Sequence, residues 1–147
     1  MSTVVKVILI VGVCLILLIL FAVGAGVYWW SQNKQTLFAA AEQSRQEGRD
    51  FGEGVEQMDC VTESLARFKK EQGMGNAIAS RLFLAECLKT SQTTEGFCES
   101  VPAESDFRNS AAWRQQQCES RSLVVSYCGT ILAQVQQFCH SGPAEAK

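Results

Sequence analysis

One apolar run, from Val7 to Trp30, constrains this chain more than any other feature. It contains no charged residue. A helix of about 24 residues, rising about 1.5 Å per residue, is roughly 36 Å long, which exceeds the roughly 30 Å hydrocarbon thickness of a bilayer. The sequence therefore predicts a transmembrane anchor over residues 1–30, with the lipid bilayer as its immediate partner.

Both ends of this run carry residues that are typical of a membrane–water interface. Tyr28, Trp29 and Trp30 close it with amphipathic aromatic rings. Lys6 precedes it, and its long side chain can extend to the lipid headgroups. We expect these four residues at the membrane interface. Positive charges on the two sides nearly balance, so the positive-inside rule does not set the orientation.

A cleaved signal peptide is the competing interpretation of the same run. Gly24, Ala25 and Gly26 are small enough for a cleavage site, and Lys6 would supply the positive N-terminal region. However, the apolar stretch exceeds the usual length of about 7–15 residues and continues into aromatic residues, which favours an uncleaved signal-anchor. Ala22 and Gly26, with Gly24 beside them, form a small-xxx-small pattern that marks a candidate helix–helix contact.

Beyond the anchor the sequence predicts an all-α fold. No segment alternates apolar and polar residues long enough to predict a strand. Good helix formers continue without a breaker, so we expect the membrane helix to extend as a stalk over residues 31–54. Its end is predicted to be a glycine-rich elbow, a hinge formed by Gly48, Gly52 and Gly54.

Residues 55–141 are predicted to form an extracytoplasmic domain of four helices, followed by a flexible tail over 142–147. The first helix is expected over Val55–Gln72. Asn76 is expected to cap the N-terminus of the second, and Pro102 to begin the third. Short turns join the first helix to the second and the third to the fourth. The predicted arrangement is therefore two disulfide-stapled antiparallel helical hairpins.

Six cysteines lie outside the apolar run, and an even number in such a domain is typical of disulfides. Cys60 and Cys87 are equally distant from the predicted turn at 73–75. Residues equidistant from the turn of an antiparallel hairpin face each other, so the sequence predicts a Cys60–Cys87 disulfide. The remaining four are Cys98, Cys118, Cys128 and Cys139.

Helix geometry narrows the pairing of these four cysteines. Cys128 and Cys139 share one face of a helix but lie about 16 Å apart along it, whereas the Cα atoms of a disulfide lie within about 7 Å. Cys118 and Cys128 flank the predicted second turn, which predicts Cys118–Cys128. The remaining pair, Cys98–Cys139, would close the other end of that hairpin. Each bridge stabilises by about 2–4 kcal/mol. Three bridges indicate an oxidising compartment: the periplasm, the cell exterior or a secretory lumen. Of these, the periplasmic side of a bacterial inner membrane is favoured.

Other function classes find little support in the sequence. The net charge of −2 and the pI near 5.4 give no electrostatic footprint for nucleic acid. Close cysteine pairs such as C-x2-C, which metal sites need, are absent from the sequence, and the lone His140 adjoins Cys139. Nucleophile–base, phosphate-loop and haem-attachment motifs are also absent. We expect no catalytic, cofactor-binding or metal-binding residues, and a protein that is not an enzyme.

The sequence thus favours a non-catalytic, single-pass membrane protein whose domain binds other proteins. Its partners would be other subunits of a membrane complex, in which it serves as an accessory or assembly subunit, or further copies of itself. One alternative is a membrane-anchored sensor with an apolar pocket between the two hairpins, which predicts a cavity larger than a few water molecules. A second alternative is a tethered thiol oxidoreductase, which predicts a reactive cysteine in the domain.

Overall fold

The computed structural model describes residues 3–141, apart from the side chains of residues 3–7, 9, 33, 37 and 141. The expected interfacial position of the Lys6 side chain and the predicted tail over 142–147 therefore lie outside the described residues. The chain divides into two compact units, Met1–Ala39 and Ala40–Lys147, which are taken one at a time below. Within the described range the named elements are all α-helices, so the predicted all-α class is confirmed.

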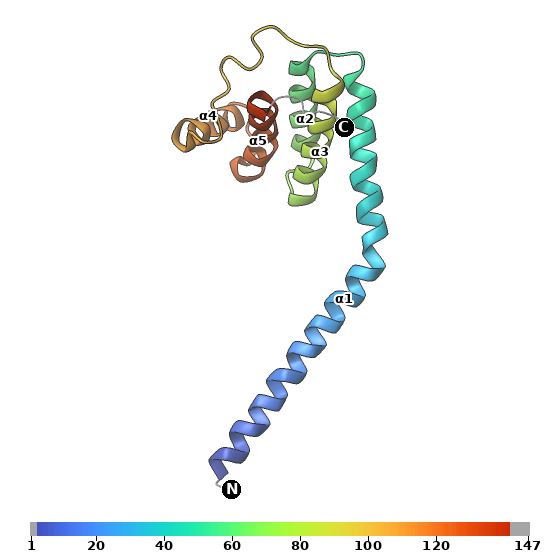
Figure 1. Ribbon diagram of the computed structural model, residues 1–147, viewed down its shortest axis with the longest axis vertical. Coiled ribbons are helices and arrows are strands. Elements are labelled where there is room, and N and C mark those ends of the chain that lie inside the picture. Colours follow the sequence, from blue (N-terminus) through green and yellow to red (C-terminus); the bar gives the residue numbers. More distant parts are fainter. Residues whose placement is uncertain (1–2, 142–147) are drawn as a thin grey trace. The chain divides into compact units, whose positions relative to one another are not determined.

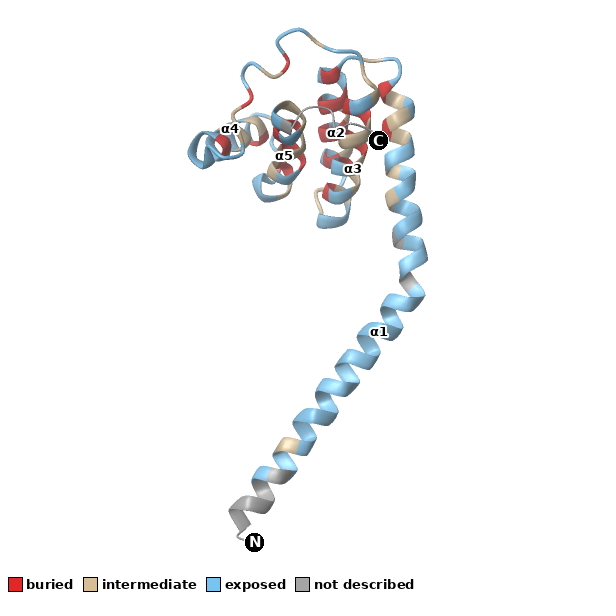
Figure 2. Ribbon diagram, in the orientation of Figure 1, coloured by how far each residue is buried: buried red, intermediate tan, exposed pale blue. Residues whose placement is uncertain are grey.

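Helix α1 spans Thr3–Gly52 and supplies the whole described part of the N-terminal unit (Figure 1). Nearly all of its described residues in that unit are exposed (Figure 2). Ile10–Gln32 is the one stretch of the described residues that is long and apolar enough to cross a membrane. A helix that is apolar on every side fits lipid better than water. Tyr28, Trp29 and Trp30 stand near the C-terminal end of this stretch, each more than half exposed.

The last turns of α1 belong to the C-terminal unit and pack against α3, which spans Met74–Thr90. Gly48 lies so close to α3 that a Cβ atom there would be 2.3 Å from the Phe83 carbonyl oxygen. At Gly52 a Cβ atom would be 2.6 Å from the Cys87 carbonyl oxygen. Both glycines belong to α1, which continues to Gly52, so neither forms a break before the end of the helix. They lie within the helix and allow two backbones to approach, because they lack a side chain.

Polar contacts join the same two segments. The Thr90 hydroxyl donates a hydrogen bond to the Arg49 carbonyl oxygen at 3.1 Å. The Arg49 guanidinium forms ion pairs with Glu42 at 2.8 Å and with Glu86 at 3.6 Å. The hydrogen bond from Arg49 is the main reason that the pKa of Glu42 is lowered. Helix α1 is therefore attached to α3 by close packing, hydrogen bonding and charge.

The remaining helices are α2 (Gln57–Lys70), α4 (Phe107–Glu119) and α5 (Val125–Ser141). Helix α5 contacts α2, α3 and α4, and α2 also packs against α3 (Figure 1). Helix α2 begins with a capping box, in which the Glu56 side chain accepts from the backbone of Asp59 and the Glu56 N–H donates to the Asp59 carboxylate at 3.2 Å. This reciprocal pair satisfies backbone donors that the first turn of a helix leaves free.

Two predicted helix starts differ from the structure. Asn76 lies inside α3, after the N-cap Gly73, and its side-chain amide instead caps the end of α2. Helix α4 begins after the N-cap Asp106, whose side chain accepts from the backbone of Asn109. Pro102 lies in the preceding connection, where its carbonyl oxygen accepts a hydrogen bond from the buried Gln136. A side-chain acceptor at Asp106 is a stronger helix start than a proline alone.

The core of the C-terminal unit lies mainly between α2, α3 and α5, where buried residues face one another (Figure 2). The largest fully buried apolar side chains are Phe68, Phe83, Leu84, Leu88, Ile131 and Leu132. Not every apolar residue of these helices faces the core, because Met58 is 50% exposed and Ile78 is 56% exposed. Helix α3 meets α1, α2 and α5, so its buried residues are not confined to one narrow stripe.

Three disulfides cross-link the C-terminal unit. Their Cα–Cα distances are 5.7 Å for Cys60–Cys87, 5.4 Å for Cys98–Cys139 and 5.9 Å for Cys118–Cys128. These are the pairs that the spacing predicts. The first joins α2 to α3, the third joins α4 to α5, and the second joins the α3–α4 connection to the end of α5. Among the described residues the free cysteine is Cys14, within the apolar part of α1.

Candidate functional site

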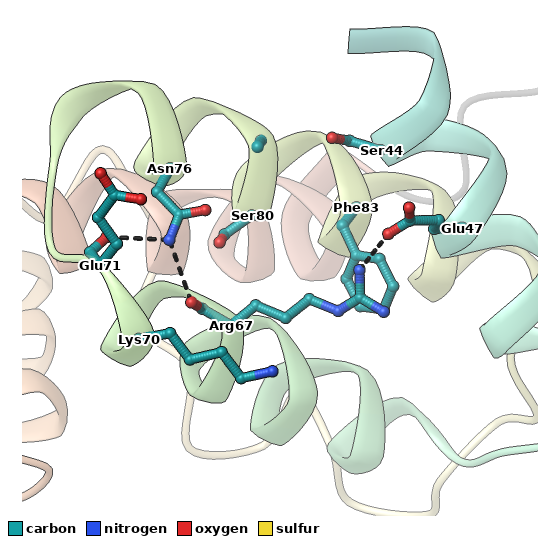
Figure 3. Close-up of a pocket in the computed structure, with 9 residues that line it drawn as sticks. Ser44, Glu47, Arg67, Lys70, Glu71, Asn76, Ser80 and Phe83 are labelled. Carbon is teal, nitrogen blue, oxygen red and sulfur yellow. Dashed lines mark hydrogen bonds and ion pairs between the residues drawn. The ribbon is translucent and has the colours of Figure 1, made fainter. Parts of the chain in front are cut away.

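A groove of about 350 Å³ lies in the C-terminal unit where the last turns of α1 meet α2 and α3 (Figure 3). Its volume is within the range of about 300–1,000 Å³ that is usual for ligand sites. Its lining is mixed in polarity and charge. The lining residues are Ser44, Glu47, Arg67, Lys70, Glu71, Asn76, Ala79, Ser80 and Phe83.

Arg67 is the lining residue that links the helices around this groove. Its Nη1 atom pairs with the carboxylate of Glu47 on α1, and its Nε atom donates to Glu63 on α2 at 2.9 Å. Its Cζ atom lies 4.0 Å from the ring centroid of Phe83 on α3. A guanidinium over an aromatic face is attracted by the negative charge density of the ring. Arg67 is thus held in one place by contacts to three helices.

Several groups stabilise the ionised form of Glu47. Gln43 donates a hydrogen bond to its Oε1 atom at 2.9 Å, and Arg67 pairs with its Oε2 atom. These two interactions, with Gln43 contributing most, lower the pKa of Glu47, although partial burial acts in the opposite direction. The carboxylate therefore acts as a permanent negative partner for Arg67.

Asn76 and Ser80 line the α3 side of the groove. The Asn76 amide nitrogen donates to the carbonyl oxygens of Arg67 at 3.1 Å and Glu71 at 2.9 Å, which fixes the orientation of the amide. Ser80 is 2% exposed. Its carbonyl oxygen accepts from the Ser64 hydroxyl at 2.9 Å, whereas its own buried hydroxyl has no hydrogen-bond partner among the residues that the structure describes. The groove therefore contains an unused buried polar group.

Lys70 lines the α2 side of the groove and is exposed. Within the described residues it forms no ion pair, in contrast to Arg67. Figure 3 shows its side chain running alongside that of Arg67. The groove thus combines one arginine that is already paired with one lysine whose charge is available to a ligand.

Two further cavities lie between α2 and the α4/α5 pair with its connecting turn, and both are smaller than the groove. One, of about 200 Å³, is bordered by residues that include Leu65, Lys69 and Leu123. The other holds about 100 Å³ and is lined by residues that include Val61, Trp113 and Leu132. Both volumes are below the range of about 300–1,000 Å³ that is usual for ligand sites, so the alternative of a small-molecule pocket between the two helix pairs gains no support from cavity size.

The residues singled out in the sequence are placed as follows. Cys60, Cys87, Cys98, Cys118, Cys128 and Cys139 are all in disulfides. Ala22 is exposed, and a Cβ atom added at Gly24 or Gly26 would meet nothing within 4 Å. The candidate helix–helix contact in the anchor therefore has no partner within the described chain. No group of three or more metal-binding side chains gathers among the described residues.

The sequence reasoning missed the groove. In the sequence, the basic residues at the end of α2 are typical of a solvated helix face. The local signal was the i,i+4 spacing of Glu63 and Arg67, which gives an ion pair on one helix. The contacts of Arg67 with Glu47 and Phe83 depend on tertiary packing, which this spacing does not report.

Comparison with known proteins gives no further guide to function. No family model matches the chain, and no curated protein or solved structure is significantly similar to it.

Proposed function

We propose that this chain is a single-pass membrane protein whose disulfide-linked domain lies on the extracytoplasmic side and binds other proteins. In this role it would be an accessory or assembly subunit of a membrane complex. The observation that carries the proposal is the contrast between the two units. One contains a helix able to span a membrane, and in the other all six cysteines are oxidised.

Disulfides favour the extracytoplasmic side because cytosolic thiols are kept reduced. With the membrane helix preceding the domain, this requires the N-terminus to remain on the cytoplasmic side. A bacterial inner membrane with the domain in the periplasm fits this requirement. We also interpret α2 with α3, and α4 with α5, as two antiparallel hairpins that the disulfides hold in register.

The surface of the domain favours protein binding. Several large apolar side chains are exposed, with exposed fractions of 50% at Met58, 61% at Met74 and 81% at Phe107. Methionine and aromatic residues are enriched in protein–protein interfaces. The disulfides hold together the helices that carry these side chains, so little backbone conformational entropy is lost on binding.

Sidedness can be tested by thiol counting on the protein in bacterial membranes. After denaturation without reductant, a maleimide-polyethylene glycol reagent should add to Cys14 alone. After reduction it should add to all seven cysteines. Labelling of several cysteines without reductant would contradict an oxidising location.

Binding can be tested by solubilising native membranes in mild detergent and separating the extract by size. The protein should migrate as a complex that is larger than a single copy of the protein in a detergent micelle. A second measurement in excess detergent should release it as a monomer. Migration as a free monomer under the mild condition would contradict the proposed role.

A further inference from the structure

Two groups in the groove of Figure 3 have hydrogen-bonding capacity that the protein itself does not use. Lys70 presents an ammonium group without an ion pair in the described part of the chain. The Ser80 hydroxyl is buried, has no hydrogen-bond partner within residues 3–141 as described, and points toward Arg67 (Figure 3). An unsatisfied buried hydroxyl carries a free-energy cost, because it has given up its hydrogen bonds to water. A ligand that satisfies it, directly or through water, recovers part of that cost.

The charges around these groups narrow the choice of ligand. Arg67 is already paired with Glu47 and Glu63, and Glu71 adds another carboxylate to the lining. The carboxylates around the groove therefore outnumber the cations, and they would repel a multiply charged anion such as a phosphate monoester. A single carboxylate can pair with Lys70 and carries less charge to be repelled.

Asn76 adds a second requirement that a ligand of the groove has to meet. The amide nitrogen of Asn76 donates to two backbone carbonyl oxygens, so the amide is held fixed with its Oδ1 atom on the groove side (Figure 3). A fixed amide oxygen accepts an N–H group. A carboxylate with N–H groups close to it is an acidic residue within a peptide chain. The Ser80 oxygen is itself covered, so it reaches such a ligand through one water molecule or after a small side-chain movement.

We propose that this groove is the docking site for an acidic segment of the partner protein. Lys70 pairs with the carboxylate of an aspartate or glutamate in that segment, and Asn76 and Ser80 bind the same segment by hydrogen bonds. This inference rests on the proposed function, because it names where, and by what chemistry, the domain would bind a protein.

Zero-length crosslinking of the full-length protein in its native membranes tests the pairing. A carbodiimide activates a carboxylate, an amine in contact attacks it, an amide forms and the reagent leaves as the urea. We expect an amide between Lys70 and an aspartate or glutamate of another protein, identified by peptide mass spectrometry. Crosslinks that form as readily through Lys69 would overturn the proposal. Lys69 is exposed on the same last turn of α2 but borders a different pocket.

Substitution of Lys70 tests the docking site separately from the proposed function. Lys70→Glu should lower the amount of co-purified partner by on the order of tenfold, whereas Lys69→Glu should leave it unchanged. A complex that survives in mild detergent and is insensitive to Lys70→Glu would overturn the docking site but keep the proposed function. The absence of any complex would overturn both.

Ser80→Ala distinguishes docking from a structural role of the hydroxyl. The variant alone should unfold at the same or a higher urea concentration than the wild type, because an unsatisfied buried group is removed. It should nevertheless retain several-fold less partner. A lower unfolding midpoint would show that the hydroxyl serves the fold, and would overturn its role in docking.

A further experiment distinguishes the acidic segment from an anionic lipid, whose headgroup would also pair with Lys70. In nanodiscs containing phosphatidylglycerol and no second protein, Lys70 and Lys69 should be acetylated at similar rates by an amine-reactive reagent. Protection of Lys70 alone in these discs would mean that a lipid headgroup occupies the groove, and would overturn the peptide assignment.

Discussion

Replacing Gly48 by alanine tests the claim that α1 is seated on α3 by direct backbone approach. The added Cβ atom would lie 2.3 Å from the Phe83 carbonyl oxygen, and a backbone atom cannot rotate away as a side chain can. The two helices would have to separate by about 1 Å to restore contact near 3.4 Å. Overpacking of this kind costs about 1–3 kcal/mol, with a rigid clash toward the upper end.

Helix propensity opposes this cost at the same position. Alanine is favoured over glycine inside a helix by about 1 kcal/mol. We therefore expect Gly48→Ala to destabilise the domain by about 2 kcal/mol net. Gly75→Ala is the matched control, because it lies in α3 and a Cβ atom there meets nothing within 4 Å. That variant should be unchanged or slightly more stable.

Urea unfolding of the oxidised, full-length protein in detergent measures both variants. The circular dichroism signal of the membrane helix gives a constant background, and the transition reports the domain. A net loss of about 2 kcal/mol lowers the midpoint by on the order of 1 M for a small domain. If Gly48→Ala raised the midpoint as Gly75→Ala does, α1 would not be packed against α3 and the reasoning would be refuted.

Three further outcomes are expected from the same assay. Gln136→Leu should cost about 2–3 kcal/mol, because Gln136 is fully buried and donates to the buried Ser110 hydroxyl at 2.8 Å, which would lose its partner. Replacing Cys98 and Cys139 together by serine should cost about 4 kcal/mol, since their disulfide closes a loop of 41 residues, and a loss below about 1 kcal/mol would contradict the loop-entropy account. Glu47→Gln should be less stable than the wild type at pH 7 by less than about 1 kcal/mol. Because folding lowers the pKa of Glu47, this difference should shrink as the pH falls below its ordinary value of 4.5, and a difference that grows on acidification would contradict the assignment.

The disulfide pairing could be predicted from the sequence because it follows from counting. Cys60 and Cys87 lie at equal distances from a turn that glycines mark, and a helical hairpin turns equal distances into contact. The packing of α1 could not be predicted in this way. A glycine such as Gly48 suits both a helix end and a close helix approach, and only the position of a second backbone decides between them.

The groove could not be predicted from the sequence for a related reason. Glu63 and Arg67 are neighbours on one helix, so their ion pair is a local property. Glu47 and Phe83 reach Arg67 from two other helices, 20 residues before it in the first case.

The attachment of α1 to the domain has a mechanical consequence. All three disulfides close loops that begin after residue 59, so no covalent cross-link reaches α1. Tension transmitted along α1 enters the domain through the main chain after Gly52 and through the non-covalent contacts of Gly48, Arg49 and Glu47. Under load these contacts would yield first, and α1 would peel from α3 while the cross-linked helices behind it kept their fold.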